Sequence, residues 1–181
     1  MLEAFITSKT RIKLLVKFFL NPGTKAYLRQ LATEFGESTN SVRVELNRLT
    51  ETGVLESAKE GNTVVYKAKP SHPLFNDICS IVNKYTGIDT IVDQVVSYLG
   101  QLEEVYLIGS YAQGVDSGVI EVVLIGNIKQ DYLQNLTERV EQEISRKLKC
   151  LVFSTEESQN FFEQYKDFKL LLWRRDEKVL S

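Results

Sequence analysis

The spacing of apolar residues changes from helical to strand-like between positions 28 and 68, and this change constrains the fold more than any other feature of the chain. Residues 28–35 and 39–52 each carry apolar side chains at helical intervals, and a tight turn at Gly36-Glu37 separates them. Gly53 ends the second helix, and two β-type runs follow at 54–58 and 63–68, joined by residues 59–62 around Gly61. The pattern predicts two helices linked by a short turn and followed by a β-hairpin.

Two serines mark where helices begin. Ser38 precedes the helix that ends at Gly53, and its hydroxyl is suited to cap that helix. Ser8 is suited to cap an earlier helix, which Asn21-Pro22-Gly23 ends. The apolar stripe of this first helix consists of Ile12, Leu15, Val16 and Phe19. The first part of the chain therefore carries three helices before the hairpin.

The helix that begins after Ser38 has one apolar face and one polar face. Val42, Leu46 and Leu49 recur at the spacing of a buried stripe. Small polar and arginine side chains on the other face are of the kind that contacts base edges and phosphates in a DNA major groove, and hairpin residues can reach the neighbouring backbone. The alternative is that these are solvated residues of a structural helix. The candidate DNA-binding residues are Thr39, Asn40, Arg43, Val44, Asn47, Arg48, Lys59 and Asn62.

The charges of the chain are unevenly distributed. Up to Gly87 there are 12 Lys and Arg against 8 Asp and Glu, which gives +4, and from Ile88 on there are 10 against 16, which gives −6. The overall net charge of −2 conceals this difference. The positive first half is compatible with double-stranded DNA as a partner, and the two halves are expected to be separate domains, 1–87 and 88–181.

The stretch YLRQLATEFGESTNSVRVELNRLTETGVLESAKEGNTVVYKA, followed by KPSHPLF, resembles the winged-helix transcriptional regulators of the ArsR/MarR-like group. The resemblance implies an α+β winged helix-turn-helix domain whose third helix contacts DNA. It places Thr39, Asn40, Arg43, Val44 and Asn47 at base-facing or groove-facing positions. Position 44 is often basic in such helices, so Val44 removes a charge and offers a contact to a thymine methyl group instead.

A helix over 74–85 follows the hairpin, with Leu74, Ile78, Ile81 and Val82 on one face. It serves either as a linker or as a contact with the same helix of a second subunit. Operators bound by winged helices are commonly two-fold symmetric, so a homodimer is expected. His72, just before this helix, is expected to be a turn residue.

The second half alternates helical and strand-like segments, which predicts an α/β domain with a mixed sheet. A helix capped by Asp89 or Thr90 and ended by Gly100 comes first, and the helix around 132–144 lies between the last two of three strands. The strands are expected at 105–108, 120–125 and 150–153. Thr155 opens another helix, Asp167 is expected to cap a further one, and 178–180 is expected to return to the sheet. The C-terminal aromatic residues are expected in the core, and Arg174-Arg175 in a solvated turn.

The pattern VYLIGSYAQG…IEVVLIG resembles the minimal nucleotidyltransferase-like domains. In active members, backbone amides at the Gly-Ser turn hold nucleotide phosphates, two carboxylates two residues apart on the next strand bind metal ions, and a third carboxylate lies on a neighbouring strand. Residues i and i+2 of a strand point to one face, so such a pair can share divalent ions. Here Glu121 matches the second position, but Val119 occupies the first, and the third strand carries Lys149.

With two of three carboxylates missing, the resemblance implies no catalytic residue, no metal site, no cofactor and no enzyme activity. Asp116 does not restore the pair, since Gly118 stands two residues further on. The candidate nucleotide- or phosphate-binding residues are Gly109, Ser110 and Glu121. The alternative is that Gly109 only permits a tight strand-to-helix connection and that Glu121 is satisfied by local hydrogen bonds.

The sequence thus predicts a DNA-binding transcriptional regulator with an inactive nucleotidyltransferase-like domain for ligand sensing, dimerisation or both. The alternative is an active metal-dependent nucleotidyltransferase that uses the winged helix to dock its substrate. Lys13 and Lys17 interrupt the apolar N-terminal stretch, so a membrane span is not expected. Cys79 and Cys150 form no metal-binding motif and are expected to be reduced thiols of a cytoplasmic protein.

Overall fold

The computed structural model describes residues 2–175 except positions 100, 129 and 166–168. The chain divides into two compact units, Met1–Tyr85 and Thr86–Ser181. The division expected after Gly87 lies two residues beyond this boundary. Each unit has its own sheet, so the two are described separately.

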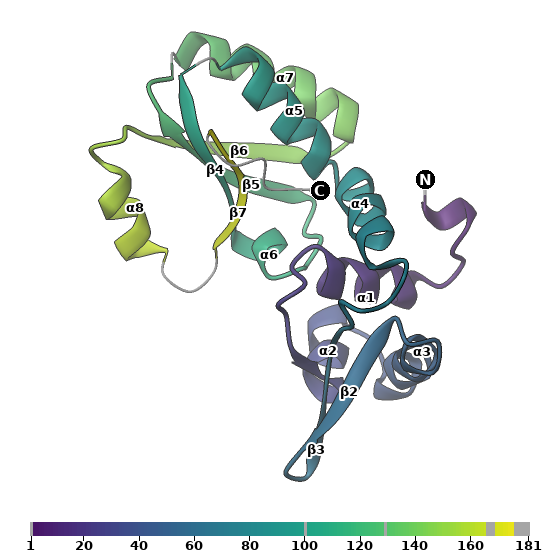
Figure 1. Ribbon diagram of the computed structural model, residues 1–181. Coiled ribbons are helices and arrows are strands. Elements are labelled where there is room, and N and C mark those ends of the chain that lie inside the picture. Colours follow the sequence, from purple (N-terminus) through teal and green to yellow (C-terminus); the bar gives the residue numbers. More distant parts are fainter. Residues whose placement is uncertain (1, 100, 129, 166–168, 176–181) are drawn as a thin grey trace. The chain divides into compact units, whose positions relative to one another are not determined.

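The first unit contains four α-helices and a three-stranded sheet in its described residues (Figure 1). A short 3₁₀ helix, η1 (Leu2–Ala4), precedes them. The helices are α1 (Lys9–Phe19), α2 (Leu28–Phe35), α3 (Thr39–Glu51) and α4 (Phe75–Thr86), and the strands are β1 (Ala26–Tyr27), β2 (Leu55–Glu60) and β3 (Thr63–Ala68). The expected order of helix, turn, helix and hairpin is present.

The capping serines are where the sequence places them. The Ser8 hydroxyl accepts a hydrogen bond from the Arg11 amide, and the Ser38 hydroxyl accepts one from the Ser41 amide. His72 lies in the turn before α4, where its Nδ1 accepts a hydrogen bond from the Leu74 amide.

The hairpin differs from the expectation in the length of its strands. β2 and β3 are antiparallel partners from Leu55↔Ala68 to Glu60↔Thr63, so the loop is reduced to Gly61-Asn62. Gly61 has a φ of +59°, a conformation that glycine adopts at little cost, and this allows the tight turn. Lys59 therefore lies within a strand and not in the loop. The strand β1, which pairs with β3, has only two residues and was not expected.

The second unit has a four-stranded sheet in the order β6-β5-β4-β7. β5 and β6 are parallel, whereas β4 is antiparallel to both of its neighbours, so the sheet is mixed as the sequence predicts. The strands are β4 (Leu102–Ile108), β5 (Val119–Gly126), β6 (Lys147–Phe153) and β7 (Lys169–Arg174). The helices are α5 (Ile88–Tyr98), α6 (Gly109–Ala112), α7 (Gln130–Ile144) and α8 (Ser158–Gln164).

Helices cover both faces of this sheet. α5 and α7 lie side by side over one face (Figure 1). Phe161 of α8 packs on the other face, in a cluster with Tyr106, Ile108, Val123 and Ile125. The central strand β5 is buried from Val122 to Gly126 on both faces, which explains its almost continuous apolar sequence. Of the C-terminal aromatic residues, Phe161 is buried in this core as expected, and Phe162 and Tyr165 are partly buried and pack against it.

Two expectations for the second unit are wrong, and a third holds only in part. α5 begins directly after Gly87, so neither Asp89 nor Thr90 caps it, because α4 ends at Thr86 and leaves one linking residue. The segment 169–174, expected to be helical, is strand β7 and pairs with β4. The solvated turn expected at Arg174-Arg175 holds only for Arg175, which is an exposed turn residue, whereas Arg174 is the last residue of β7. The two arginines make ion pairs with Glu104 at 2.7 Å and Glu103 at 3.0 Å.

Other expected features fall on residues outside the described ones. These are the helix end at Gly100, the cap at Asp167 and the strand over 178–180. Within the described residues, no helix is both long enough and apolar enough to cross a membrane.

Candidate functional site

The orientation of α3 is set by its buried face. Val42 and Leu46 are fully buried, and Leu49 is nearly so. Glu45 is buried among them with only 6% of its surface exposed, although a carboxylate is costly to bury without partners. Its position in the apolar stripe means that the protein must compensate its charge.

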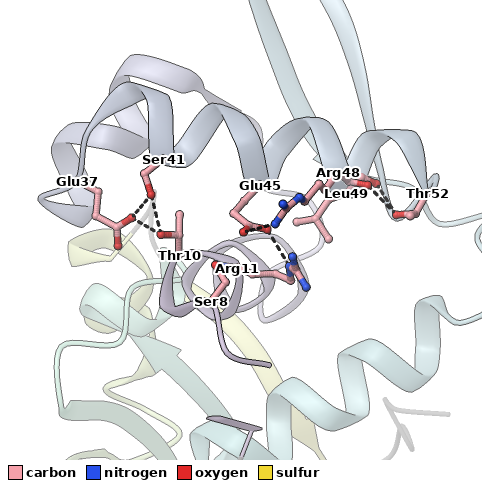
Figure 2. Close-up of polar contacts among 9 residues, drawn as sticks. All are labelled: Ser8, Thr10, Arg11, Glu37, Ser41, Glu45, Arg48, Leu49 and Thr52. Atoms are coloured by element: carbon pink, nitrogen blue, oxygen red, sulfur yellow. Dashed lines mark hydrogen bonds and ion pairs between the residues drawn. The ribbon is translucent and has the colours of Figure 1, made fainter. Parts of the chain in front are cut away.

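Two arginines provide that compensation (Figure 2). Arg11 of α1 donates from Nε to Glu45 Oε2 at 2.8 Å, and Arg48 Nη1 lies 3.2 Å from Glu45 Oε1. Burial raises the pKa of Glu45, but hydrogen bonds from Arg11 and Ser8 and the nearby arginine charges outweigh it, so the pKa is below its ordinary value. Glu45 is therefore ionised at neutral pH and joins α3 to α1.

A second carboxylate holds the start of α3. Glu37, just before the helix, accepts hydrogen bonds from the hydroxyls of Thr10 and Ser41 (Figure 2). It also accepts one from Lys13 Nζ at 2.8 Å. Burial raises the pKa of Glu37, yet these hydrogen bonds and the Lys13 charge lower it overall. The first turn and the middle of α3 are thus both attached to α1, which presents the opposite face of α3 in one orientation.

The predicted DNA-binding residues lie on that opposite face. The candidate side chains on α3 are all exposed, including Val44 at 41%. Within the part of the chain that the structure describes, five of them make no side-chain hydrogen bond and no ion pair: Thr39, Asn40, Arg43, Val44 and Asn47. Arg48 differs, because Glu45 holds its guanidinium, although 58% of the Arg48 side chain remains exposed.

The hairpin places the other two candidates at its far end. Asn62 lies in the turn, and Lys59 lies three positions before it near the end of β2. Both side chains are exposed. The hydroxyl of Tyr27 on β1 donates to Glu60 at 2.9 Å, which fixes the position of that carboxylate near the tip and leaves its negative charge in place. Among the described residues, Lys59 is the cation closest to the turn.

The Gly-Ser turn of the second unit connects β4 to α6. Gly109 has a φ of +66°, and a Cβ at this position would collide with Oε2 of Glu121. Ile108 is the antiparallel partner of Glu121, so the strand register brings the carboxylate against the turn. The glycine is required here both by its backbone conformation and by the close approach of Glu121.

Glu121 is also next to Lys149. The two residues are register partners on the parallel strands β5 and β6, and Lys149 Nζ lies 3.5 Å from Glu121 Oε1. Val119 shares the face of Glu121 and supplies no ligand atom. A lysine beside a single carboxylate repels a divalent cation, so these residues do not fit the metal site of the resembling family. No group of three His, Cys, Asp or Glu side chains among the described residues could hold a metal ion.

A cluster near this turn was not foreseen from the sequence. The hydroxyl of the fully buried Tyr111 donates to Asp116, and Arg146 donates from Nε to that hydroxyl at 2.8 Å. Arg146 Nη2 lies 2.7 Å from Asp116 Oδ2, and the Gly118 amide donates to Asp116 at 3.1 Å. Asp116 is therefore committed to the loop between α6 and β5, and no spacing in the sequence relates it to Arg146, which lies thirty positions away.

The same cluster shifts the pKa values of its members. Burial raises the pKa of Tyr111, and the hydrogen bond to Asp116 raises it further. Burial also acts to raise the pKa of Asp116, but hydrogen bonds from Arg146 and Tyr111 lower it overall. These groups are held in one charge state at neutral pH, which suits a structural contact better than acid–base chemistry.

The two cysteines lie in surroundings that disfavour the thiolate form. Burial raises the pKa of Cys79, and it raises the pKa of Cys150 to about 11. Both are free and half-buried, which agrees with the expectation of reduced thiols.

No family model matches the chain, and no curated protein matches it. Among solved structures, a proposed nucleotidyltransferase from Sulfolobus solfataricus is 24% identical with a TM-score of 0.40, over 59% of this chain and 93% of the other. Reduced HlyU from Vibrio cholerae N16961 is 15% identical with a TM-score of 0.38, over 48% and 83%. A mutant of the toxin–antitoxin pair MntA-HpeT is 15% identical with a TM-score of 0.38, over 49% and 72%. All three TM-scores are below 0.5, so the function has to be argued from the residues of this chain.

Proposed function

We propose that this chain is a sequence-specific DNA-binding transcriptional regulator, in which the first unit acts as a winged helix and α3 enters the major groove. The observation that carries the proposal is the row of exposed polar side chains on α3 that have no partner in the described part of the chain. Hydrogen-bonding groups left free on a rigidly held helix are available for base edges.

The contacts of α3 support a division of roles among its arginines. Arg43 has no partner among the residues that the structure describes, so its guanidinium can form two parallel hydrogen bonds with a guanine. Arg48 is tied to Glu45, so it can add charge near a phosphate but has less freedom to follow a base edge. Lys59 and Asn62 at the end of the hairpin are suited to the DNA backbone next to the groove.

For the second unit we propose a role without catalysis, as a surface for ligand sensing, dimerisation or both. Phosphoryl or nucleotidyl transfer by two metal ions needs several carboxylates around one point, and here Glu121 stands alone beside Lys149. The position of the Glu121 carboxylate against Gly109 also disfavours a phosphate at this turn, because the two negative charges would be adjacent. Gly109 is better explained as a requirement of the strand-to-helix connection.

The test is fluorescence anisotropy of the full-length protein with labelled DNA from upstream of its own coding sequence, against a scrambled duplex at near-physiological salt. A preference of roughly 10³ or more for the upstream DNA is the expected result. Equal and steeply salt-dependent binding to both duplexes would indicate electrostatic attraction without recognition of that sequence.

A second assay tests the competing activity. The purified protein is incubated with nucleoside triphosphates and Mg²⁺ or Mn²⁺, alongside Glu121→Ala. No turnover is expected from either protein. Metal-dependent turnover by the wild type that is lost in Glu121→Ala would overturn the assignment of a non-catalytic second unit.

A further inference from the structure

The side chain at the centre of the outer face of α3 is apolar. Val42 and Leu46 stand two positions before and after Val44, and both are fully buried, whereas Val44 is 41% exposed. Successive residues of an α-helix turn by about 100°, so residues two positions apart lie almost on opposite sides of the helix. Val44 therefore points directly away from the protein.

Polar side chains surround Val44 on this face. Asn40 and Asn47 occupy the neighbouring turns of the helix on the same side, and Arg43 directly precedes Val44. These three polar residues are exposed and make no side-chain hydrogen bond or ion pair within the part of the chain that the structure describes. Single exposed apolar residues are common, but this one lies in the middle of the row that the proposed function assigns to the major groove.

The major groove offers a valine few favourable contacts. Its floor consists of ring nitrogens, carbonyl oxygens and amino groups, together with the C5-methyl group of thymine. A valine placed on one of the polar groups removes water from it and returns no hydrogen bond, which is unfavourable. The methyl group is the feature that an apolar side chain can cover without this cost. Cytosine carries the same methyl group at the same ring position once it is methylated to 5-methylcytosine.

We propose that Val44 recognises the C5-methyl group itself, so that the base it faces is a methylated pyrimidine, either thymine or 5-methylcytosine. Unmodified cytosine lacks the group and is disfavoured at this position. Arg43 is suited to a guanine in an adjoining base pair. Methylation of a cytosine that faces Val44 then strengthens binding, and the affinity of the regulator depends on the methylation state of its DNA. This recognition rests on the proposed function, because it requires α3 to enter the major groove.

The first test removes the methyl group from thymine. The full-length protein selects its preferred site from a pool of random-sequence duplexes, and each thymine of the selected duplex is then replaced in turn by deoxyuridine, which lacks only the methyl group. For at least one thymine, fluorescence anisotropy is expected to show binding weakened by about fourfold, the effect of one buried methyl group. In Val44→Ser, which removes the apolar contact, the same replacement should change the affinity by less than about 1.5-fold.

The second test adds the methyl group to cytosine. The thymine–adenine pair found in the first test is replaced by cytosine–guanine, with and without the C5-methyl group. The wild type is expected to bind the methylated duplex about fourfold more tightly than the unmodified one, and Val44→Ser is expected to bind both alike. Val64→Ser is the matched control, because Val64 on β3 is a valine of similar exposure, at 42%, outside α3. It should keep the preference for the methyl group, and circular dichroism verifies that each variant is folded.

The outcomes separate this recognition from the proposed function. A selected duplex that tolerates deoxyuridine at every thymine would overturn the methyl recognition and leave sequence-specific binding in place. The same holds for a 5-methylcytosine duplex that binds no better than the unmodified one, or for a methyl preference that persists in Val44→Ser or disappears in Val64→Ser. A pool from which no sequence is enriched would overturn the proposed function, and the methyl recognition with it.

Discussion

The outer face of α3 and the Gly109 turn are two places where the sequence predicts a ligand, and they differ in how the chain uses its own charges. On α3, Arg43 and its polar neighbours have no partner in the described part of the chain. At the turn, Glu121 lies against Gly109 and beside Lys149, and nearby Asp116 is held by Arg146. A surface that serves an external partner leaves its polar groups available, whereas charges that compensate each other serve the fold. The expectation is therefore that substitutions on α3 change binding and that substitutions around the turn change stability.

The largest expected effect is on the stability of the second unit. Arg146→Met should lower its free energy of unfolding by about 2–3 kcal/mol, because Asp116 and the buried Tyr111 hydroxyl lose their shared partner. Urea unfolding followed by fluorescence measures this directly, since Trp173 is the only tryptophan and lies in the second unit. Arg139→Met, at an exposed arginine that stacks on Tyr98, is the control and should cost well under about 1 kcal/mol. Equal losses in the two variants would contradict a structural role for the cluster.

Arg43→Ala tests the other side of the comparison. It should weaken binding to the preferred DNA by about 2 kcal/mol if the side chain contacts a base, and it should leave unfolding unchanged because Arg43 has no partner in the described chain. Arg29→Ala, at an exposed arginine on α2, is the control and should leave the ratio of specific to scrambled binding as it is. The base-contacting role is refuted if Arg43→Ala weakens binding to both duplexes alike.

A double-mutant cycle at the Gly-Ser turn tests whether Gly109 has a structural role, through its backbone conformation and the close approach of Glu121. Gly109→Ala should destabilise the second unit by about 1–2 kcal/mol through its positive φ, with a further cost from the collision with Glu121. In the Glu121→Ala background only the cost of the backbone conformation should remain, so the same substitution should be less damaging there. The free energies of unfolding are measured by Trp173 fluorescence. If the losses caused by the two substitutions are additive, the two residues do not constrain each other.

The smallest effect concerns pH. The pKa of Asp116 is lower in the folded protein than its ordinary value of 3.8, so its ionised form stabilises the second unit above that pH. This contribution is lost as the pH falls through the folded pKa. The stability advantage of the wild type over Asp116→Asn should therefore shrink between about pH 5 and about pH 3. A difference that stays constant across this range would show that the charge of Asp116 is not what stabilises the loop.

The sequence predicted well those features that depend on neighbours along the chain. The inward stripe of α3 and the caps at Ser8 and Ser38 follow from spacing and local hydrogen bonding, and all are present. The apolar run of β5 likewise gave a buried strand. In each case the information lies within a few residues, which is the range over which periodicity and capping act.

Features that depend on distant partners were missed or misassigned. The run before Trp173 is apolar at every position, so periodicity cannot separate a strand from a helix, and pairing with β4 decides the outcome. Glu45 interrupts the apolar stripe of α3, and this was the one sequence signal for its buried pairing with Arg11. The contacts of Asp116 with Arg146 carry no such signal, because strand order alone brings them together.

The candidate sites divide in the same way. The exposed face of α3 follows from helical periodicity, since whatever is not in the buried stripe is outside. Glu121, Gly109 and Lys149 come from three separate segments. Only the sheet register shows that Lys149 is adjacent to Glu121 and that Gly109 has no room for a side chain.

The outer half of the β2–β3 hairpin has a consequence for the kinetics of local opening. Four consecutive residues at the far end of β2 are exposed, as are the first two of β3, so this part is held by its hydrogen-bond ladder and by Tyr27 through Glu60. Amides near Gly61 should exchange with solvent much faster than those near Leu55, which is almost fully buried. In the proposed complex with DNA, a hairpin end that opens often would adjust to the DNA backbone, and it would lose conformational entropy on binding.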